Sequence, residues 1–87
     1  MQTIFSKSYC PYCKKTKALF AGMPEVSEKV FELDQMENGA AIQQYLLQKT
    51  GQRTVPSVFV NGQHVGGNDD THAAAQSGKL AQMLAEN

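Results

Sequence analysis

The sequence predicts an α/β fold: a four-stranded mixed β-sheet flanked by helices, in the order β-α-β-α-β-β-α. Short β-rich runs alternate with segments of helical periodicity, which is typical of βαβ units with parallel strands. Residues 57–65 contain Asn-Gly between two strand-like runs, the signature of a tight antiparallel hairpin. A chain of 87 residues has room for one hydrophobic core, so we assign residues 1–87 to a single domain.

The first half of the chain has the pattern of a βαβ unit. Residues 3–6 (Thr-Ile-Phe-Ser) form a short strand, and a helix follows over 11–20. Its first residue is proline, whose missing N–H would have no intrahelical partner, so Cys10 becomes the N-cap. Residues 22–24 (Gly-Met-Pro) end this helix, and the β-rich run 30–33 forms the second strand.

The second half contains a helix, a hairpin and a final helical region. The helix opens at Asn38 or a neighbour and stops at Gly51. The hairpin over 57–65 turns at Asn-Gly with type I′ geometry. The final helical region is broken at 77–78 (Ser-Gly) before the chain closes. We expect the core to contain Phe5, Leu19, Phe20, Phe31, Leu33, Ile42, Leu46, Val58, Val60, Leu80 and Leu84.

Charge and hydropathy exclude several classes of protein. Lys plus Arg and Asp plus Glu number eight each, so the net charge is zero, which argues against a nucleic-acid partner. No apolar run approaches the roughly 18 residues of a membrane span, and the first residues do not resemble a signal peptide. We therefore expect a soluble protein without a membrane partner. We further expect it to be monomeric and cytoplasmic, although removal of a targeting segment would allow an organelle.

The two cysteines, Cys10 and Cys13, lie at the start of the first predicted helix. At this spacing their side chains are close enough to form a disulfide and open it again. A sulfur at the N-cap can accept hydrogen bonds from the N–H groups of Tyr12 and Cys13, which favours the thiolate and makes Cys10 the attacking residue. Cys13, one turn inside the helix, should be more buried and less acidic, and so suited to resolving a mixed disulfide.

Two other interpretations of the cysteine pair are weaker. A structural disulfide between them would close a very small loop and stabilise the fold less than a long-range bridge. A structural zinc site would need more ligands, and the spacing of His64 and His72 does not match the usual pattern. The preceding strand and following helix favour a redox motif.

Three motifs together give the sequence a family resemblance. They are Cys10-Pro11-Tyr12-Cys13, Thr54-Val55-Pro56 and Gly66-Gly67-Asn68-Asp69-Asp70. With Lys7 ahead of them and Thr-Gly-Gln-Arg at 50–53, the chain resembles a dithiol glutaredoxin from about Ile4 to Leu84. The resemblance implies a thioredoxin fold with a cis peptide bond before Pro56, glutathione as reductant and co-substrate, and no metal.

The resemblance also implies a groove that binds glutathione. Its residues would be Lys7, Tyr12, Gln43, Arg53, Thr54, Val55, Pro56, Gly67, Asp69 and Asp70. Lys7 and Gln43 would bind the glycine carboxylate, and Arg53 would either help them or be a surface charge. The backbone of Val55 would pair with the cysteinyl residue as in β-augmentation, and Asp70 would bind the γ-glutamyl amine.

The implied activity is that of a glutathione-dependent thiol-disulfide oxidoreductase. Cys10 is the expected nucleophile and Cys13 the resolving residue, with protein–glutathione mixed disulfides and protein disulfides as substrates. Such an enzyme would serve electron transport and cell redox homeostasis. Two alternatives stay open: an iron-sulfur cluster carrier using Cys10 and glutathione in a dimer, and a thioredoxin-like reductase served by a flavoprotein.

Overall fold

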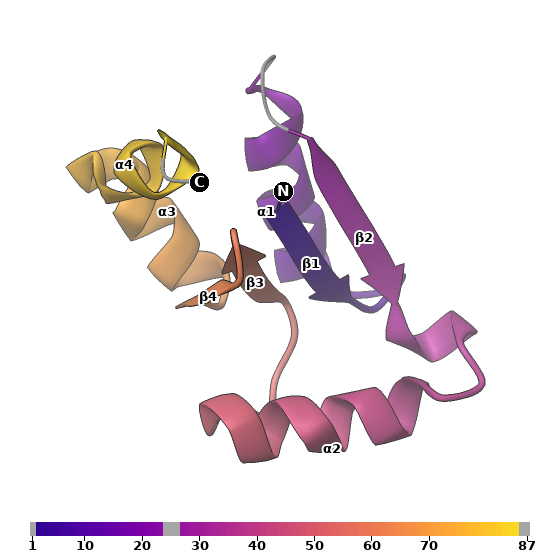
Figure 1. Ribbon diagram of the computed structural model, residues 1–87. Coiled ribbons are helices and arrows are strands. Elements are labelled where there is room, and N and C mark those ends of the chain that lie inside the picture. The colour runs from indigo at the N-terminus through magenta and orange to yellow at the C-terminus, as the bar shows by residue number, and fades with distance from the viewer. Residues whose placement is uncertain (1, 24–26, 86–87) are drawn as a thin grey trace.

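A mixed β-sheet forms the centre of the computed structural model, which describes residues 2–23 and 27–85 (Figure 1). Its four strands are β1 (Gln2–Ser6), β2 (Glu28–Glu32), β3 (Ser57–Val60) and β4 (Gln63–Gly66), in the spatial order β2-β1-β3-β4. β1 pairs with β2 in parallel, whereas β1 with β3 and β3 with β4 are antiparallel. The predicted mixed sheet of a thioredoxin fold is confirmed.

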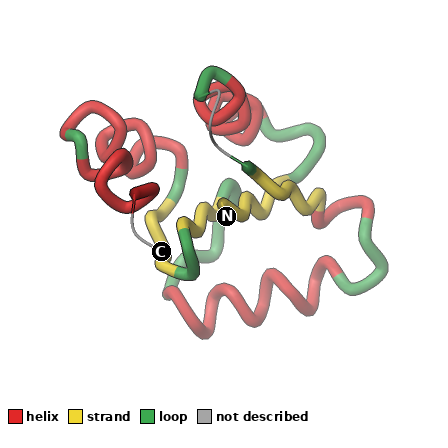
Figure 2. Tube along the Cα trace, turned by 45° about the horizontal axis from the view of Figure 1, so that its top comes forward, coloured by secondary structure: helices red, strands yellow, loops and turns green. Residues whose placement is uncertain are grey.

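Helices cover both faces of this sheet (Figure 2). In chain order they are α1 (Pro11–Ala21), the short 3₁₀ helix η1 (Leu33–Gln35), α2 (Gly39–Thr50), α3 (Asn68–Ser77) and α4 (Lys79–Ala85). Because successive strand residues point to opposite faces, Ile4 packs on the side of α1, α3 and α4, and Phe5 on the side of α2. None of the described helices is long and apolar enough to span a membrane.

Some predicted boundaries differ from those observed. Leu33, expected as the last residue of the second strand, instead begins η1 and is buried. The hairpin is as predicted, with positive φ at Asn61 (48°) and Gly62 (84°). The expected break at Gly78 has φ 84° and separates α3 from α4. Of the predicted stop at 22–24, Pro24 lies outside the described residues.

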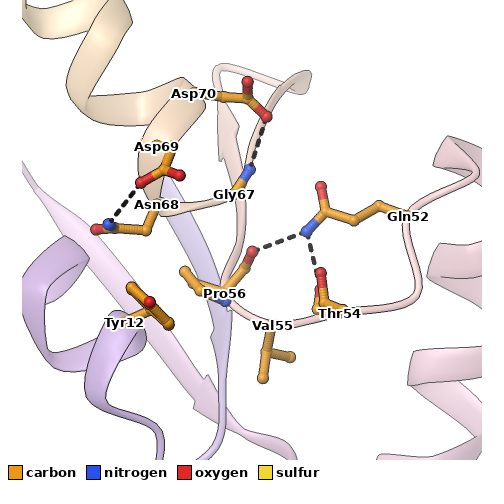
Figure 3. A pocket seen from close by; sticks show the side chains of 9 residues that line it. All are labelled: Tyr12, Gln52, Thr54, Val55, Pro56, Gly67, Asn68, Asp69 and Asp70. Atoms are coloured by element: carbon orange, nitrogen blue, oxygen red, sulfur yellow. Dashed lines mark hydrogen bonds between the residues drawn. The ribbon is translucent and has the colours of Figure 1, made fainter.

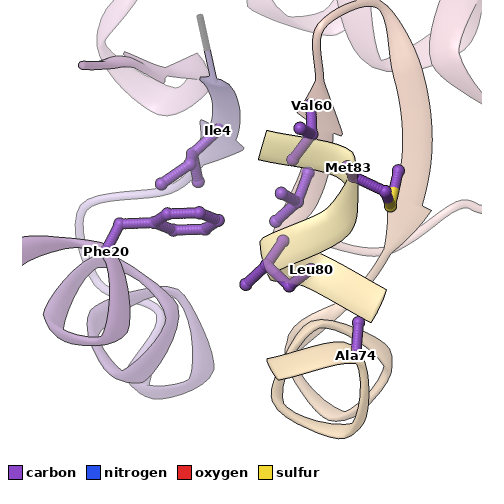
Figure 4. Close-up of a cluster of buried hydrophobic side chains, with 7 residues drawn as sticks. Ile4, Phe20, Val60, Ala74, Leu80 and Met83 are labelled. Atoms are coloured by element: carbon purple, nitrogen blue, oxygen red, sulfur yellow. The ribbon is translucent and has the colours of Figure 1, made fainter. Parts of the chain in front are cut away.

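The main core lies between the sheet and the three helices α1, α3 and α4 (Figure 4). Its buried members are Ile4, Phe20, Val58, Val60, Ala74, Leu80 and Met83. Leu33 and Leu46 are also buried, as expected. The remaining core candidates are only half-buried: Phe5, Leu19, Phe31, Ile42 and Leu84. On the α2 side the Phe5 ring stacks on Phe31 at 5.5 Å between centroids and meets Phe59 edge-on at 5.9 Å, so the aromatic residues form a second, more open layer.

Candidate functional site

The sheet brings three distant chain segments to one edge. β1 ends at Ser6, and its antiparallel pairing sets Phe5 opposite Ser57, so β3 begins where β1 ends. β4 runs back along β3 and ends at Gly66, which pairs with Val58. The segments that leave these strand ends are therefore neighbours: the cysteine loop after β1, the proline loop before β3 and the glycine-aspartate segment after β4.

Cys10 caps the first turn of α1. Its extended backbone (φ −86°, ψ 117°) places Sγ where it accepts a hydrogen bond from the Cys13 N–H at 3.2 Å. The predicted N-cap is therefore confirmed, with the bond formed by Cys13. Both residues are free thiols, and Cys10 is 9% exposed while Cys13 is fully buried. The Cys10 thiol also points toward the Val55 carbonyl, 3.9 Å away, so it lies at the edge of the proline loop.

The buried position of Cys13 changes its acidity. Burial raises the pKa of the Cys13 thiol, and its contact with Cys10 adds to this effect. Hydrogen bonds from the Lys7 backbone and the Ser6 side chain act in the opposite direction without cancelling the rise. Cys13 is thus more buried than Cys10 and has a raised pKa, as expected from its place one turn inside the helix.

A hollow of about 470 Å³ opens beside the cysteines (Figure 3). It is formed by the first turn of α1, the loop before β3 and the first turn of α3. Its lining residues are Tyr12, Gln52, Thr54, Val55, Pro56, Gly67, Asn68, Asp69 and Asp70. Tyr12 is 56% exposed, so one wall of the hollow is an accessible aromatic ring.

The loop before β3 is shaped by its backbone and by one glutamine. The Val55–Pro56 peptide bond is cis, as the resemblance implied. Gln52 Nε2 donates hydrogen bonds to the carbonyls of Thr54 and Pro56, both at 2.8 Å, and so links the two residues on either side of Val55. Gln52 was not among the predicted site residues. Its sequence signal was its place in the Thr-Gly-Gln-Arg run at 50–53, but the side-chain bonds depend on the folded loop.

The first turn of α3 forms the opposite wall. The Gly67 N–H donates to Asp70 Oδ2 at 3.3 Å, and Asn68 Nδ2 donates to Asp69 Oδ1 at 3.4 Å. Thr16 on α1, fully buried, donates to Asn68 Oδ1 at 3.0 Å and connects this turn to the cysteine helix. Two carboxylates at a helix start give this end of the hollow negative charge, which suits an amine.

The predicted binding residues divide into two groups. Those that line the hollow are Tyr12, Thr54, Val55, Pro56, Gly67, Asp69 and Asp70. Lys7, Gln43 and Arg53 are not part of its lining. Gln43 Nε2 donates to the Arg53 carbonyl at 3.0 Å, and both residues line a separate hollow of about 280 Å³ beside α2. The Lys7 carbonyl accepts a bond from the Cys10 N–H at 3.0 Å, which places its backbone in the cysteine loop.

The histidines do not join the cysteines. His64 Nε2 lies 3.3 Å from Ser57 Oγ on the hairpin, and burial lowers the pKa of His64, with nearby Asp70 acting in the opposite direction. Within residues 2–23 and 27–85, no three His, Cys, Asp or Glu side chains gather where they could hold a metal ion.

The fold and the site together define the class of protein. A dithiol pair at the start of a helix after β1, facing a cis-proline loop in a four-stranded mixed sheet, is the arrangement of a thioredoxin-fold redox protein. The Glutaredoxin family model matches residues 3–65. The chain therefore belongs to the glutaredoxin family, whose members are glutathione-dependent oxidoreductases.

Individual relatives agree with this assignment. The chain is 56% identical over 81 residues to Glutaredoxin-C4 of Arabidopsis thaliana, which covers 93% of this chain and 59% of that protein. It is 56% identical over 82 residues to Glutaredoxin-C8 of Oryza sativa subsp. japonica, with 93% and 60% covered. It thus spans about three fifths of the length of these two relatives. The crystal structure of a buckwheat glutaredoxin–glutathione complex superimposes with a TM-score of 0.91 at 48% identity, covering 95% of this chain and 74% of that one.

Proposed function

We propose that this protein is a glutathione-dependent thiol-disulfide oxidoreductase that reduces protein–glutathione mixed disulfides and, by a second route, protein disulfides. The observation that carries the proposal is the position of Cys10: a capped, free thiol whose Sγ faces the Val55 carbonyl at the edge of the 470 Å³ hollow. The similarity to a glutaredoxin that was crystallised with glutathione supports the choice of ligand.

The hollow offers complementary groups for an extended tripeptide. The backbone of Val55 can pair with the cysteinyl residue of glutathione, which brings its sulfur toward Cys10. The carboxylate of Asp70 suits the γ-glutamyl amine, and the first N–H groups of α3 suit the neighbouring carboxylate. Lys7 is the cation assigned to the glycine carboxylate at the other end, with Gln43 and Arg53 as further candidates for that end.

The proposed reaction is two thiol-disulfide exchanges. The Cys10 thiolate attacks the glutathione sulfur of the mixed disulfide, and the protein thiol leaves and takes up a proton from water. A second glutathione, as thiolate, attacks the glutathione sulfur on Cys10 and forms glutathione disulfide, which regenerates the Cys10 thiolate. The N–H of Cys13 bonds to the Cys10 sulfur and stabilises the thiolate in both exchanges.

Protein disulfides would use both cysteines. Cys10 attacks one sulfur of the substrate, Cys13 then displaces the substrate by attacking Cys10, and two glutathione molecules reduce the resulting disulfide. Because glutaredoxins have potentials of roughly −200 to −230 mV, near that of the glutathione pool, such an enzyme works in a reducing compartment. We propose the cytoplasm on this basis, and we further propose that the protein is monomeric.

The test is NADPH consumption with glutathione, glutathione reductase and a glutathionylated peptide. The wild type and Cys13→Ser should be active, and Cys10→Ser should be inactive, because the first exchange needs only Cys10. Loss of all activity in Cys13→Ser would contradict the assigned division between the cysteines. An inactive wild type would reject the proposed function, and absorbance after anaerobic cluster reconstitution would then test the carrier alternative.

A further inference from the structure

Two segments 26 residues apart are joined at the edge of the active site. Parallel pairing of β1 and β2 sets Ser6 beside Glu32, and two residues beyond each strand Ser8 meets Asp34. The Ser8 N–H donates to Asp34 Oδ1 at 2.9 Å, and the Ser8 hydroxyl donates to Asp34 Oδ2. Both oxygens of one carboxylate are thus used to hold a single residue of the cysteine loop.

These two hydrogen bonds hold the loop that carries Lys7. Lys7 lies between the sheet and Ser8, and its carbonyl accepts the Cys10 N–H at 3.0 Å. The loop is therefore fixed at Ser8 by Asp34 and at Cys10 by the helix cap. The hydrogen bonds from Ser8 lower the pKa of Asp34, and the positive charge of Lys7 acts in the same direction, so the carboxylate is ionised at neutral pH.

The 3₁₀ helix that carries Asp34 also sets the position of α2. Gly39, the first residue of α2, packs so closely on η1 that an added Cβ would lie 1.8 Å from the Leu33 carbonyl oxygen. Gln43 follows one turn further along α2. Through η1, the loop of Lys7 and the helix of Gln43 are held in one fixed arrangement.

We propose that Asp34 is a positioning residue that fixes Lys7 for recognition of the glycine carboxylate of glutathione. The inference rests on the proposed function and adds a group that does not touch the substrate. A lysine side chain loses conformational freedom when it pairs with a ligand, and a backbone already held in place reduces what must be ordered on binding. Asp34 acts through Ser8, so its loss should weaken binding of the carboxylate end and leave the chemistry at Cys10 in place.

The experiment compares a peptide that carries glutathione in a mixed disulfide with the same peptide carrying glutathione glycine ethyl ester, in which this carboxylate is neutral, at one fixed concentration of free glutathione. Release of the peptide thiol from a glutathionylated peptide is followed by liquid chromatography, which avoids any dependence on glutathione reductase. Asp34→Ala should raise KM for the peptide carrying glutathione about fivefold and KM for the peptide carrying the ester less than about twofold, the range of a coupling between neighbouring residues. Lys7→Ala should abolish the preference for glutathione over the ester altogether.

Three further variants separate the causes. Asp34→Asn keeps an acceptor for the Ser8 N–H and a polar partner for its hydroxyl, so it should restore most of the preference for glutathione. Ser8→Ala removes one of the two bonds and should give a smaller shift in the same direction, which carries the test if Asp34→Ala does not fold. Glu37→Ala removes an exposed charge three positions away and should leave both KM values unchanged.

The outcomes are distinct. A folded Asp34→Ala with the wild-type KM for the peptide carrying glutathione overturns the inference. An equal rise in KM for the peptides carrying glutathione and its ester overturns it too, because it would mean that the loop is only loosened. A double variant of Ser8 and Asp34 should be no worse than Asp34→Ala alone, and additive losses would contradict action through one contact. A wild type without glutathione turnover rejects the proposed function itself.

Discussion

Replacing Gly66 with alanine would show whether Asp70 holds the γ-glutamyl end of glutathione. Gly66 has φ +132°, and an added Cβ would lie 2.3 Å from Asp70 Oδ2 and 2.7 Å from its Cβ. The side chain of Asp70 must therefore move, and it loses its bond from the Gly67 N–H. A backbone conformation reserved for glycine costs about 1–3 kcal/mol in alanine, and the lost bond to a carboxylate adds about 1.5 kcal/mol at an exposed position.

A second glycine supplies the matched control. Gly62 also has positive φ (+84°), but within the described chain an added Cβ there meets no atom within 4 Å. Gly62→Ala should therefore cost only the backbone term of about 1–2 kcal/mol. Urea unfolding followed by circular dichroism gives the free energy of unfolding, and peptide deglutathionylation gives KM for the glutathionylated peptide.

The two variants should differ in binding more than in stability. Gly66→Ala should raise KM for the glutathionylated peptide about tenfold, as Asp70→Ala should, because a charged contact with the amine is worth about 1.4 kcal/mol or more. Gly62→Ala should leave KM unchanged. If the two alanine variants lose equal stability and neither changes KM, Asp70 is not a binding residue and the reasoning is refuted.

Two further predictions concern stability. Gly39→Ala should lower the free energy of unfolding by about 1–3 kcal/mol in urea, because its Cβ would overlap the Leu33 carbonyl; a neutral effect would contradict the close packing of α2 on η1. Burial alone raises the pKa of Glu32, but hydrogen bonds from Lys17 (2.8 Å) and Ser6 outweigh it and hold the pKa below the usual 4.5. The contribution of this ion pair to the free energy of unfolding is present above pH 4.5 and is lost as the pH falls through the lowered pKa of Glu32 in the folded protein. Lys17→Met should therefore make the free energy of unfolding depend less on pH in that range. An unchanged dependence on pH would show that the ion pair contributes nothing.

Local sequence signals were sufficient for much of the fold. The Asn61-Gly62 turn requires positive φ at both positions, which few residue pairs adopt easily, so the turn of the hairpin could be placed. The shift in pairing between Val58 and Phe59 was not predicted. The proline after Cys10 likewise fixed the helix start and, with it, the cap on the sulfur. These features depend on a few adjacent residues and need no tertiary contact.

The half-buried aromatic layer shows where local signals fail. Phe5 and Phe31 read as core residues from their hydrophobicity, yet both are only half-buried because α2 leaves that face of the sheet partly open. Ile4, which points to the opposite face, is fully buried. Strand alternation predicts that neighbours face opposite sides, but which side is better covered depends on how many helices pack there.

The candidate site also has one part that local motifs predict and one part that depends on a contact between distant residues. Tyr12, Val55 and Asp70 come from motifs whose local geometry is encoded in a few residues, and the strand ends bring all three to one hollow. The end that we assign to the glycine carboxylate has no such motif: next to Lys7, Ser8 is held by its bonds to Asp34, which join residues 26 apart. A lysine in the right position of the sequence is therefore not enough to define this end of the groove. Its affinity for a carboxylate should depend on a residue that no active-site motif contains.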